Sequence, residues 1–157
     1  FLTGCGTPAP AFTAEHRAAI VDSVNAMLAD FRAAVGTLDG DSVASFYVAD
    51  STLRWIEDGT VRYTARGQIA QAFQGFRGSI TGSRLLYDGT VVTPLAPGVA
   101  VMSSGFAQQF ARADGTSGGF AGAVSAVVVH RGDRWLFQSG HTSSAPPAAT
   151  GDAAPRS

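Results

Sequence analysis

The sequence predicts an α+β domain, with N-terminal helices packed on a strongly curved, mixed but mainly antiparallel sheet. One long stretch near the start carries apolar residues at three- and four-residue spacing, which is typical of an amphipathic helix. The second half alternates apolar and polar residues between turn signals, as strands do. Helices followed by strands favour an α+β arrangement over an alternating one. The expected order is helix, helix, strand, strand, helix and four further strands.

Size and composition limit the classes of function. The chain has 157 residues, 45% hydrophobic and 15% charged, which suits one globular domain. Its net charge of −1 gives no electrostatic footprint for nucleic acid. A single cysteine excludes an intrachain disulfide and leaves a zinc site short of ligands. The sequence has no metal, phosphate or nucleophile motif and no apolar run near the roughly 18 residues of a spanning helix, so no cofactor is expected.

Three helices are expected before the main sheet. The first is capped by Thr13 and stops at Gly36, because a hydroxyl suits the start of a helix and glycine suits its end. The second is short and is capped by Asp39 or Asp41. The third covers roughly 65–76 and has a narrow apolar stripe.

The first hairpin spans 52–63 around Asp58-Gly59, a type I′ turn signal. In this register Trp55 faces Arg62, and Glu57 shares the face of Trp55. The next two strands are expected over 84–93 and 99–112, separated by the proline-containing segment 94–98, with a bulge at Gly105.

The second hairpin spans 120–144 around Gly132-Asp133, which fits a type II′ turn. Both of its faces are largely apolar, so it is expected in the middle of the sheet with cover on both sides. The register set by the turn places His141 opposite Val124, on the same face as Trp135 and Phe137.

The first residues resemble the end of a bacterial lipoprotein signal. Leu2-Thr3-Gly4-Cys5 matches the lipobox pattern of an apolar residue, two small residues and a cysteine. The resemblance implies cleavage before Cys5, a lipid on its sulfur, and an extracytoplasmic domain held to the bacterial cell envelope by that anchor alone. The alternative is an unrelated free cysteine. Residues 1–11 are thus expected to be signal end and tether, 12–144 the domain, and 145–157 a disordered tail.

The long first helix is followed by Phe46-Tyr47 with Asp50, Trp55-Ile56-Glu57-Asp58-Gly59, the 66–76 helix and a closing strand at 135–143. Together these segments resemble the nuclear transport factor 2-like fold, also called SnoaL-like or ketosteroid-isomerase-like, over roughly 14–144. The resemblance implies a conical pocket between the concave sheet and the helices, and a homodimer through the outer sheet face. This superfamily includes isomerases, dehydratases, cyclases and association domains, so the fold alone assigns no function.

Two side chains are candidate acid/base groups. His141 ends the central hairpin, and a histidine at the mouth of a cone is suited to proton transfer near neutral pH. Glu57 lies on the Trp55 face, where a carboxyl against an indole has a raised pKa. A hydrogen-bonded core histidine and a solvated carboxylate are the structural alternatives. Asp50 is interpreted as a turn residue.

The remaining candidates would line an apolar pocket for a small hydrophobic molecule. Half-buried aromatic packing is the structural alternative for the tyrosines, and Gln108 contacts a ligand if it faces inward. The residues are Tyr47, Trp55, Tyr63, Tyr87, Phe106, Gln108, Phe120, Trp135 and Phe137. Three functions therefore stay open. The first is an envelope-tethered binding domain, the second is a cofactor-free isomerase, dehydratase or cyclase using His141 and Glu57, and the third is a dimerising accessory module without a pocket.

Overall fold

The computed structural model describes residues 12–145; the expected signal, Cys5 and nearly all of the expected tail lie outside the described residues. The helices are α1 (Ala14–Thr37), α2 (Gly40–Ala44) and α3 (Arg66–Gln74). The strands are β1 (Arg54–Glu57), β2 (Thr60–Tyr63), β3 (Ile80–Ala96), β4 (Val99–Arg112), β5 (Ser117–Arg131) and β6 (Arg134–Ser144). The predicted order of elements is confirmed. Among the described residues no helix is long and apolar enough to cross a membrane.

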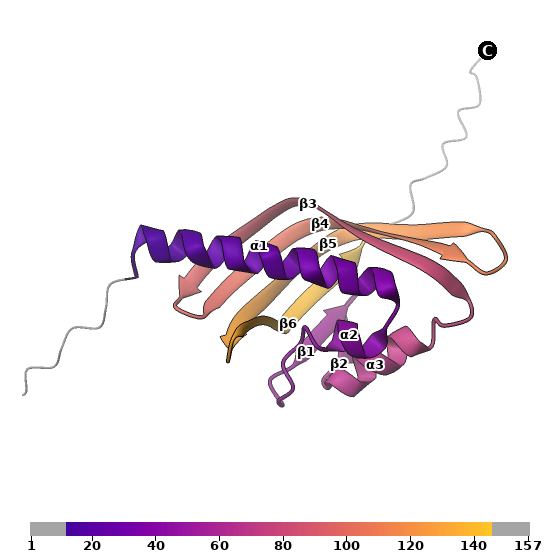
Figure 1. Ribbon diagram of the computed structural model, residues 1–157, viewed down its shortest axis with the longest axis horizontal. Coiled ribbons are helices and arrows are strands. Elements are labelled where there is room, and N and C mark those ends of the chain that lie inside the picture. Colours follow the sequence, from indigo (N-terminus) through magenta and orange to yellow (C-terminus); the bar gives the residue numbers. More distant parts are fainter. Residues whose placement is uncertain (1–11, 146–157) are drawn as a thin grey trace, which may run out of the picture.

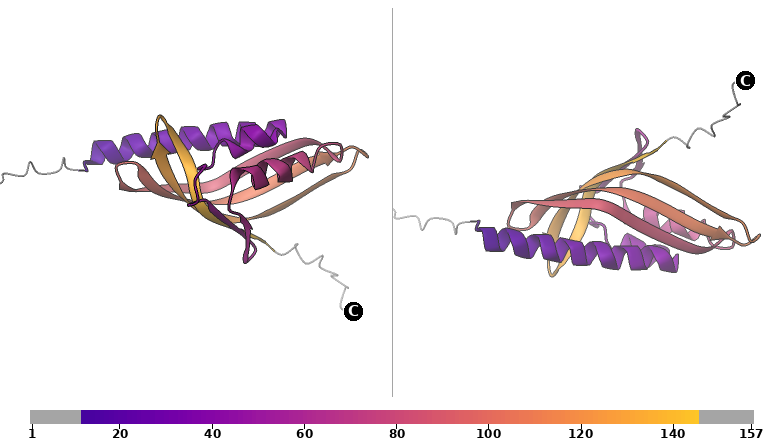
Figure 2. Two further views of the ribbon diagram at one scale, coloured as in Figure 1. Left: turned by 90° about the horizontal axis from the view of Figure 1, so that it is seen from below. Right: turned by 90° about the horizontal axis from the view of Figure 1, so that it is seen from above.

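The six strands form one sheet in the order β2-β1-β6-β5-β4-β3. β1 pairs with β6 in parallel and every other pair is antiparallel, so the sheet is mixed as predicted. β5 and β6 occupy the middle, which confirms the prediction from their two apolar faces. The long strands curl, and α1 lies lengthwise along the concave side with α2 and α3 near β1 and β2 (Figures 1 and 2).

α1 begins as the sequence predicts, because the Thr13 hydroxyl accepts a hydrogen bond from the His16 amide at 3.2 Å. Its end differs from the prediction. The helix runs past Gly36, and Leu38 takes the left-handed conformation with φ 57°, donating its amide to the Val35 carbonyl. The buried stripe of α1 faces the sheet and consists of Val24, Met27, Leu28, Phe31, Ala34 and Val35.

Turn chemistry accounts for the hairpins. Asp58 and Gly59 both have positive φ, 48° and 80°, as a type I′ turn requires, while Gly132 has φ 62° at the second hairpin.

β3 continues through Pro94 instead of stopping before it. An edge strand tolerates proline because the missing amide need not pair.

The irregularity predicted at Gly105 belongs to the neighbouring strand. β4 pairs with β5 without interruption, whereas the register of β3 shifts between Asp88 and Val91. Gly105 stands opposite Asp88, and a Cβ there would lie 3.3 Å from the Asp88 carbonyl oxygen. The glycine therefore permits a close backbone approach beside the bulge.

A second bulge, in β6, reverses an important expectation. Val128 pairs with Phe137 as predicted, but Val127 pairs with Ser139, so one extra residue has entered β6. His141 consequently pairs with Ser125 and not with Val124. Since side chains alternate along a strand, the extra residue moves His141 to the outer face of the sheet, opposite α1. The prediction that His141 shares the face of Phe137 is wrong.

Five aromatic rings fill the centre of the core where α1 meets the sheet. Phe137 is only 1% exposed, and its ring centroid lies 5.0 Å from Phe31, 5.2 Å from Tyr47 and 5.6 Å from Trp55. Phe46 packs on Phe31 at 5.5 Å. Phe137, predicted as a ligand contact, is therefore part of the packed core.

Candidate functional site: a tyrosine cluster on the concave face

Three predicted site residues form a cluster with Glu57 beside the aromatic core. Tyr47 follows α2, Tyr63 ends β2, and Tyr87 lies on β3. Burial raises the pKa of Tyr47, and the nearby Tyr87, Glu57 and Tyr63 raise it further. Burial also raises the pKa values of Tyr87 and Tyr63. Segments far apart in the sequence thus place Tyr87, Glu57 and Tyr63 near enough to Tyr47 to raise its pKa; we call these four residues the tyrosine cluster.

Two hydroxyls of the tyrosine cluster have no partner in the described part of the chain. Tyr47 is 6% exposed and Tyr87 is half-buried, and neither hydroxyl hydrogen-bonds to another described residue. Among the described residues no buried side-chain oxygen or nitrogen is both sealed and unsatisfied. The two hydroxyls therefore reach accessible space, where water or a ligand satisfies them.

Glu57 supplies the carboxyl of the tyrosine cluster and shares the face of Trp55, as predicted. Burial raises the pKa of the Glu57 carboxyl, although the Arg62 guanidinium, 3.4 Å away, lowers it. The Glu57 side chain is still 35% exposed, so solvent reaches it. A partly desolvated carboxyl with a raised pKa is suited to proton exchange as well as to ligand binding.

Trp55 is held at the base of the cluster by its neighbours. Its ring lies 5.3 Å from the Tyr47 ring, and the expected pairing with Arg62 is replaced by one with Tyr63, because the register shifts beside it. A Cβ on Gly140 would lie 2.3 Å from the Trp55 ring. Only glycine leaves room for this ring on the adjacent strand.

Four predicted residues continue the site as a strip across β3, β4 and β5. Tyr87 pairs with Phe106, and Gln108 pairs with both Leu85 and Phe120, so these side chains share the concave face. The Phe106 and Phe120 rings meet edge-on at 5.8 Å, and Phe120 is 50% exposed. We call Tyr87, Phe106, Gln108 and Phe120 the concave strip.

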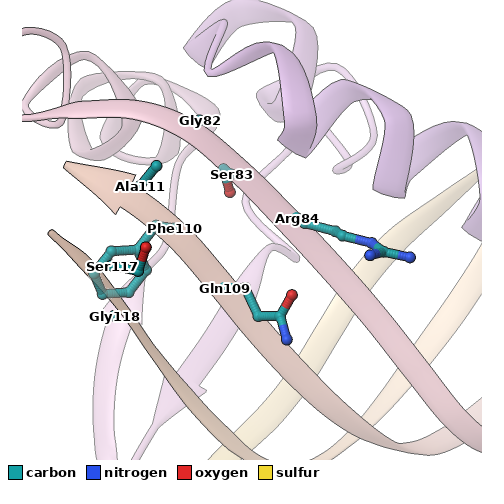
Figure 3. Close-up of a pocket in the computed structure, with 8 residues that line it drawn as sticks. All are labelled: Gly82, Ser83, Arg84, Gln109, Phe110, Ala111, Ser117 and Gly118. Carbon is teal, nitrogen blue, oxygen red and sulfur yellow. The ribbon is translucent and has the colours of Figure 1, made fainter. Parts of the chain in front are cut away.

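An open hollow of about 540 Å³ lies next to the concave strip, over one end of β3, β4 and β5. Gln108 donates a 2.5 Å hydrogen bond to Ser83, which lines this hollow with Phe110. Figure 3 shows Phe110 and Ser117 close together at one side, with the Arg84 side chain extending away from them. Gln108 thus connects the concave strip to the lining of this hollow.

Two predicted residues lie elsewhere. His141 is exposed on the outer face, in a hollow of about 370 Å³ lined largely by serine, glycine and alanine. Ile56 pairs with His141 and Glu57 with Thr142, so Glu57 and His141 are strand neighbours that face opposite sides of the sheet. Trp135 lies near the β5–β6 turn and lines a third cleft with α1. Neither residue joins the tyrosine cluster.

Asp50 is the turn residue that the sequence predicts. Its carboxylate accepts hydrogen bonds from the Thr52 amide at 2.9 Å and from the Thr52 hydroxyl, and these bonds lower its pKa. The side chain is exposed, so it closes the turn in front of β1.

Arg66 supports the tyrosine cluster but was not anticipated. Its guanidinium donates to the Tyr47 carbonyl and, at 3.4 Å, to the Ser45 carbonyl, which ties the start of α3 to the segment after α2. Nothing local in the sequence marks this contact, because its partners lie about twenty residues away. Gly140 carries a weak signal, as an isolated glycine in a strand often marks a close approach. The described residues contain no group of three or more potential metal ligands.

Comparison with known proteins gives a fold but no close relative. No protein-family model matches the chain, and no curated protein does. Among solved structures, a Novosphingobium aromaticivorans protein provisionally described as a scytalone dehydratase matches with a TM-score of 0.73 and 12% identity, covering 82% of this chain and 86% of that one.

Two further solved structures agree. A nuclear transport factor 2-like superfamily protein from Salmonella enterica matches with a TM-score of 0.70 and 15% identity, over 86% of this chain and 97% of that one. A Xanthomonas campestris protein is provisionally described as a calcium/calmodulin-dependent protein kinase II association domain. It matches with a TM-score of 0.67 and 21% identity, over 78% of this chain and 86% of that one. At such identities the likeness concerns the fold.

Proposed function

We propose that this chain, which has the nuclear transport factor 2-like fold, binds a small apolar molecule carrying a hydroxyl or carbonyl group. The polar group bonds to Tyr47 and Tyr87, and the apolar body lies along the concave strip towards the hollow at Ser83. The observation that carries the proposal is the pair of tyrosine hydroxyls without a partner among the described residues.

The surroundings of these hydroxyls favour this class of ligand. The half-exposed Phe120, which packs on the buried Phe106, supplies aromatic surface, and Gln108 adds a neutral polar group already oriented by Ser83. Apolar walls with a few placed polar groups are typical of small-molecule sites. A hydrogen bond between a phenol and a ligand oxygen stabilises the complex in such surroundings, because the local dielectric constant is low and the bond is stronger there than in water.

The test of location uses the two indole N–H resonances in a ¹H–¹⁵N correlation spectrum. Trp55 lies 5.3 Å from Tyr47, whereas Trp135 lies outside the cluster, so 2-naphthol should shift the Trp55 resonance and leave that of Trp135 in place. Trp135→Phe assigns the two peaks. A saturating shift of Trp135 alone, or of neither peak, overturns the proposal.

A second candidate function is proton transfer at Glu57, which the raised pKa and partial burial of this carboxyl favour. A carboxylate beside an aromatic site can remove a proton next to a bound ketone. We expect exchange of the α-hydrogens of 2-tetralone for deuterium, followed by NMR, to slow about a hundredfold in Glu57→Gln. Asp88→Asn, at an exposed position, is the matched control. Equal exchange rates in Glu57→Gln and Asp88→Asn would contradict proton transfer at Glu57, and binding would then be the single proposed function.

The proposed cellular setting comes from the Leu2-Thr3-Gly4-Cys5 pattern, which supports a lipid anchor at Cys5 and a place in the bacterial cell envelope. Mass spectrometry of the natively expressed protein should find an acylated N-terminal cysteine. Cys5→Ser should leave the membrane fraction while keeping the fold. An unmodified Cys5 in the native protein contradicts this setting and leaves the binding proposal intact.

A further inference from the structure

A separate cleft of about 380 Å³ lies at the opposite end of β5 from the hollow at Ser83, between α1 and the β5–β6 turn. Ser23, Ala26 and Asp30 of α1 line it. Their spacing places them along one side of the helix, and the two small side chains leave space beside the sheet. The cleft is therefore independent of the tyrosine cluster.

The floor of the cleft is apolar but contains one unpaired donor. Met27, Phe46 and Trp135 are buried, with 8%, 8% and 9% exposure. The Trp135 indole N–H bonds to no other described residue, yet no described polar side-chain atom is both sealed and unsatisfied. This N–H is therefore not sealed within the described residues, and either water or a ligand can accept its hydrogen bond. His130 packs edge-on against the Trp135 ring at 5.3 Å and fixes its orientation.

The rim carries both signs of charge. Asp30, Asp133 and Arg134 line the cleft, and all three are exposed. Within residues 12–145 the ion pairs are Glu57 with Arg62 and Asp39 with Arg77, so the three rim charges do not pair with one another. Arg134 lies with its guanidinium carbon 5.4 Å from the centroid of the Phe46 ring. Two carboxylates and one guanidinium thus remain available to a ligand.

We propose that this cleft binds a small zwitterion of the α-amino-acid class with an apolar side chain. Its ammonium group pairs with Asp30 and Asp133. Its carboxylate accepts from the Arg134 guanidinium and the Trp135 indole N–H, and its side chain covers Met27 and Phe46. This arrangement satisfies each unpaired group of the cleft with one small molecule. A purely cationic ligand would leave the indole N–H and Arg134 without an acceptor, and a purely anionic one would face two carboxylates.

The test compares three molecules that share one apolar body. L-Phenylalanine has both charges, phenethylamine lacks the carboxylate, and 3-phenylpropionate lacks the amine. We expect L-phenylalanine to shift the indole resonance of Trp135 in the full chain and to leave that of Trp55 in place. Each deleted charge should weaken binding by up to about fivefold, the upper end of the range for exposed ion pairs.

Charge-removing variants make the assignment specific. Asp30→Asn should reduce the advantage of L-phenylalanine over 3-phenylpropionate, because only Asp133 then pairs with the ammonium group, and should keep its advantage over phenethylamine. Arg134→Gln should reduce the advantage over phenethylamine alone, because only the Trp135 indole N–H then donates to the carboxylate. Asp22→Asn, exposed on α1 outside the cleft, is the matched control and should change neither. The proposal is overturned by equal binding of all three molecules, by no shift of Trp135 at millimolar L-phenylalanine, or by Asp30→Asn and Arg134→Gln behaving like Asp22→Asn.

Discussion

The Trp55 ring occupies the space that a side chain on Gly140 would fill, with ring carbons 2.3, 2.7 and 2.8 Å from the position of its Cβ. Trp55 and Gly140 are directly paired on the parallel strands β1 and β6. Because Tyr47 packs on the other side of this ring at 5.3 Å, the glycine sets the position of the tyrosine cluster.

Gly140→Ala should destabilise the protein. The added methyl group meets a buried ring that is enclosed by Tyr47 and Phe137, so the cost should be about 1–3 kcal/mol in the free energy of unfolding. Urea denaturation followed by near-ultraviolet circular dichroism measures it. Gly67→Ala in α3 is the control, since its Cβ meets nothing within 4 Å and should cost nothing. Equal stability of Gly140→Ala and the wild type would refute the close packing.

Glu57→Gln should make stability less dependent on pH. Burial raises the pKa of Glu57 in the folded state, so the folded protein holds this proton more tightly than the unfolded chain does. The wild type therefore loses stability as pH rises from below the unfolded value, near 4.5, through the raised folded value. Glutamine removes that loss. In urea denaturation we expect the variant to be more stable than the wild type at pH 7, and this difference in the free energy of unfolding to shrink by pH 4. A difference that grows towards pH 4 would contradict a raised pKa of Glu57 in the folded protein.

Asp58 should hold the end of β6 to the β1–β2 turn. Its carboxylate accepts the Ser144 amide at 2.7 Å and the Ser144 hydroxyl at 3.1 Å. Asp58→Ala should cost about 1 kcal/mol and speed hydrogen exchange at the Ser144 amide. Asp58→Asn keeps an acceptor oxygen and tolerates the positive φ of 48°, so it should retain most of the protection. Unchanged exchange in Asp58→Ala would show that the clamp is not made in solution.

The outer face is the proposed surface for a homodimer. Val101 and Val127 are directly paired there and only partly buried, although His141, beside Ser125, makes this face more polar than the sequence predicts. Val101→Asp should give a folded monomer in sedimentation velocity while Val61→Asp, on the edge strand β2, stays dimeric. A monomeric wild type would exclude the dimer.

Local signals predicted most of the fold. Thr13, Asp58-Gly59 and Gly132 mark their cap and turns by backbone chemistry that acts within a few residues. The central place of β5 and β6 followed from their two apolar faces. Such features need no knowledge of distant parts of the chain.

The site was predicted less completely, because one extra residue in a strand moves all following side chains to the other face of the sheet. The extra residue in β6 between Phe137 and Ser139 moved His141 to the outer face. The sequence contains no turn signal or proline that would predict this bulge. The position of Arg66 under Tyr47 depends on tertiary packing and has no local pattern. By contrast, Tyr47, Tyr63 and Tyr87 were named as candidates for their hydroxyl groups and Glu57 for its place on the Trp55 face, and in the structure the other three lie near enough to Tyr47 to raise its pKa.

The central claim, that the hydroxyls of Tyr47 and Tyr87 bind a ligand oxygen, is tested most directly by comparing 2-naphthol with naphthalene. These molecules share one apolar body and differ by one hydroxyl group. We predict that the wild type prefers 2-naphthol about fivefold, the value of one neutral hydrogen bond, and that Tyr47→Phe/Tyr87→Phe binds both with equal dissociation constants. Equal affinity in the wild type, or a preference that survives in the double variant, would contradict the account.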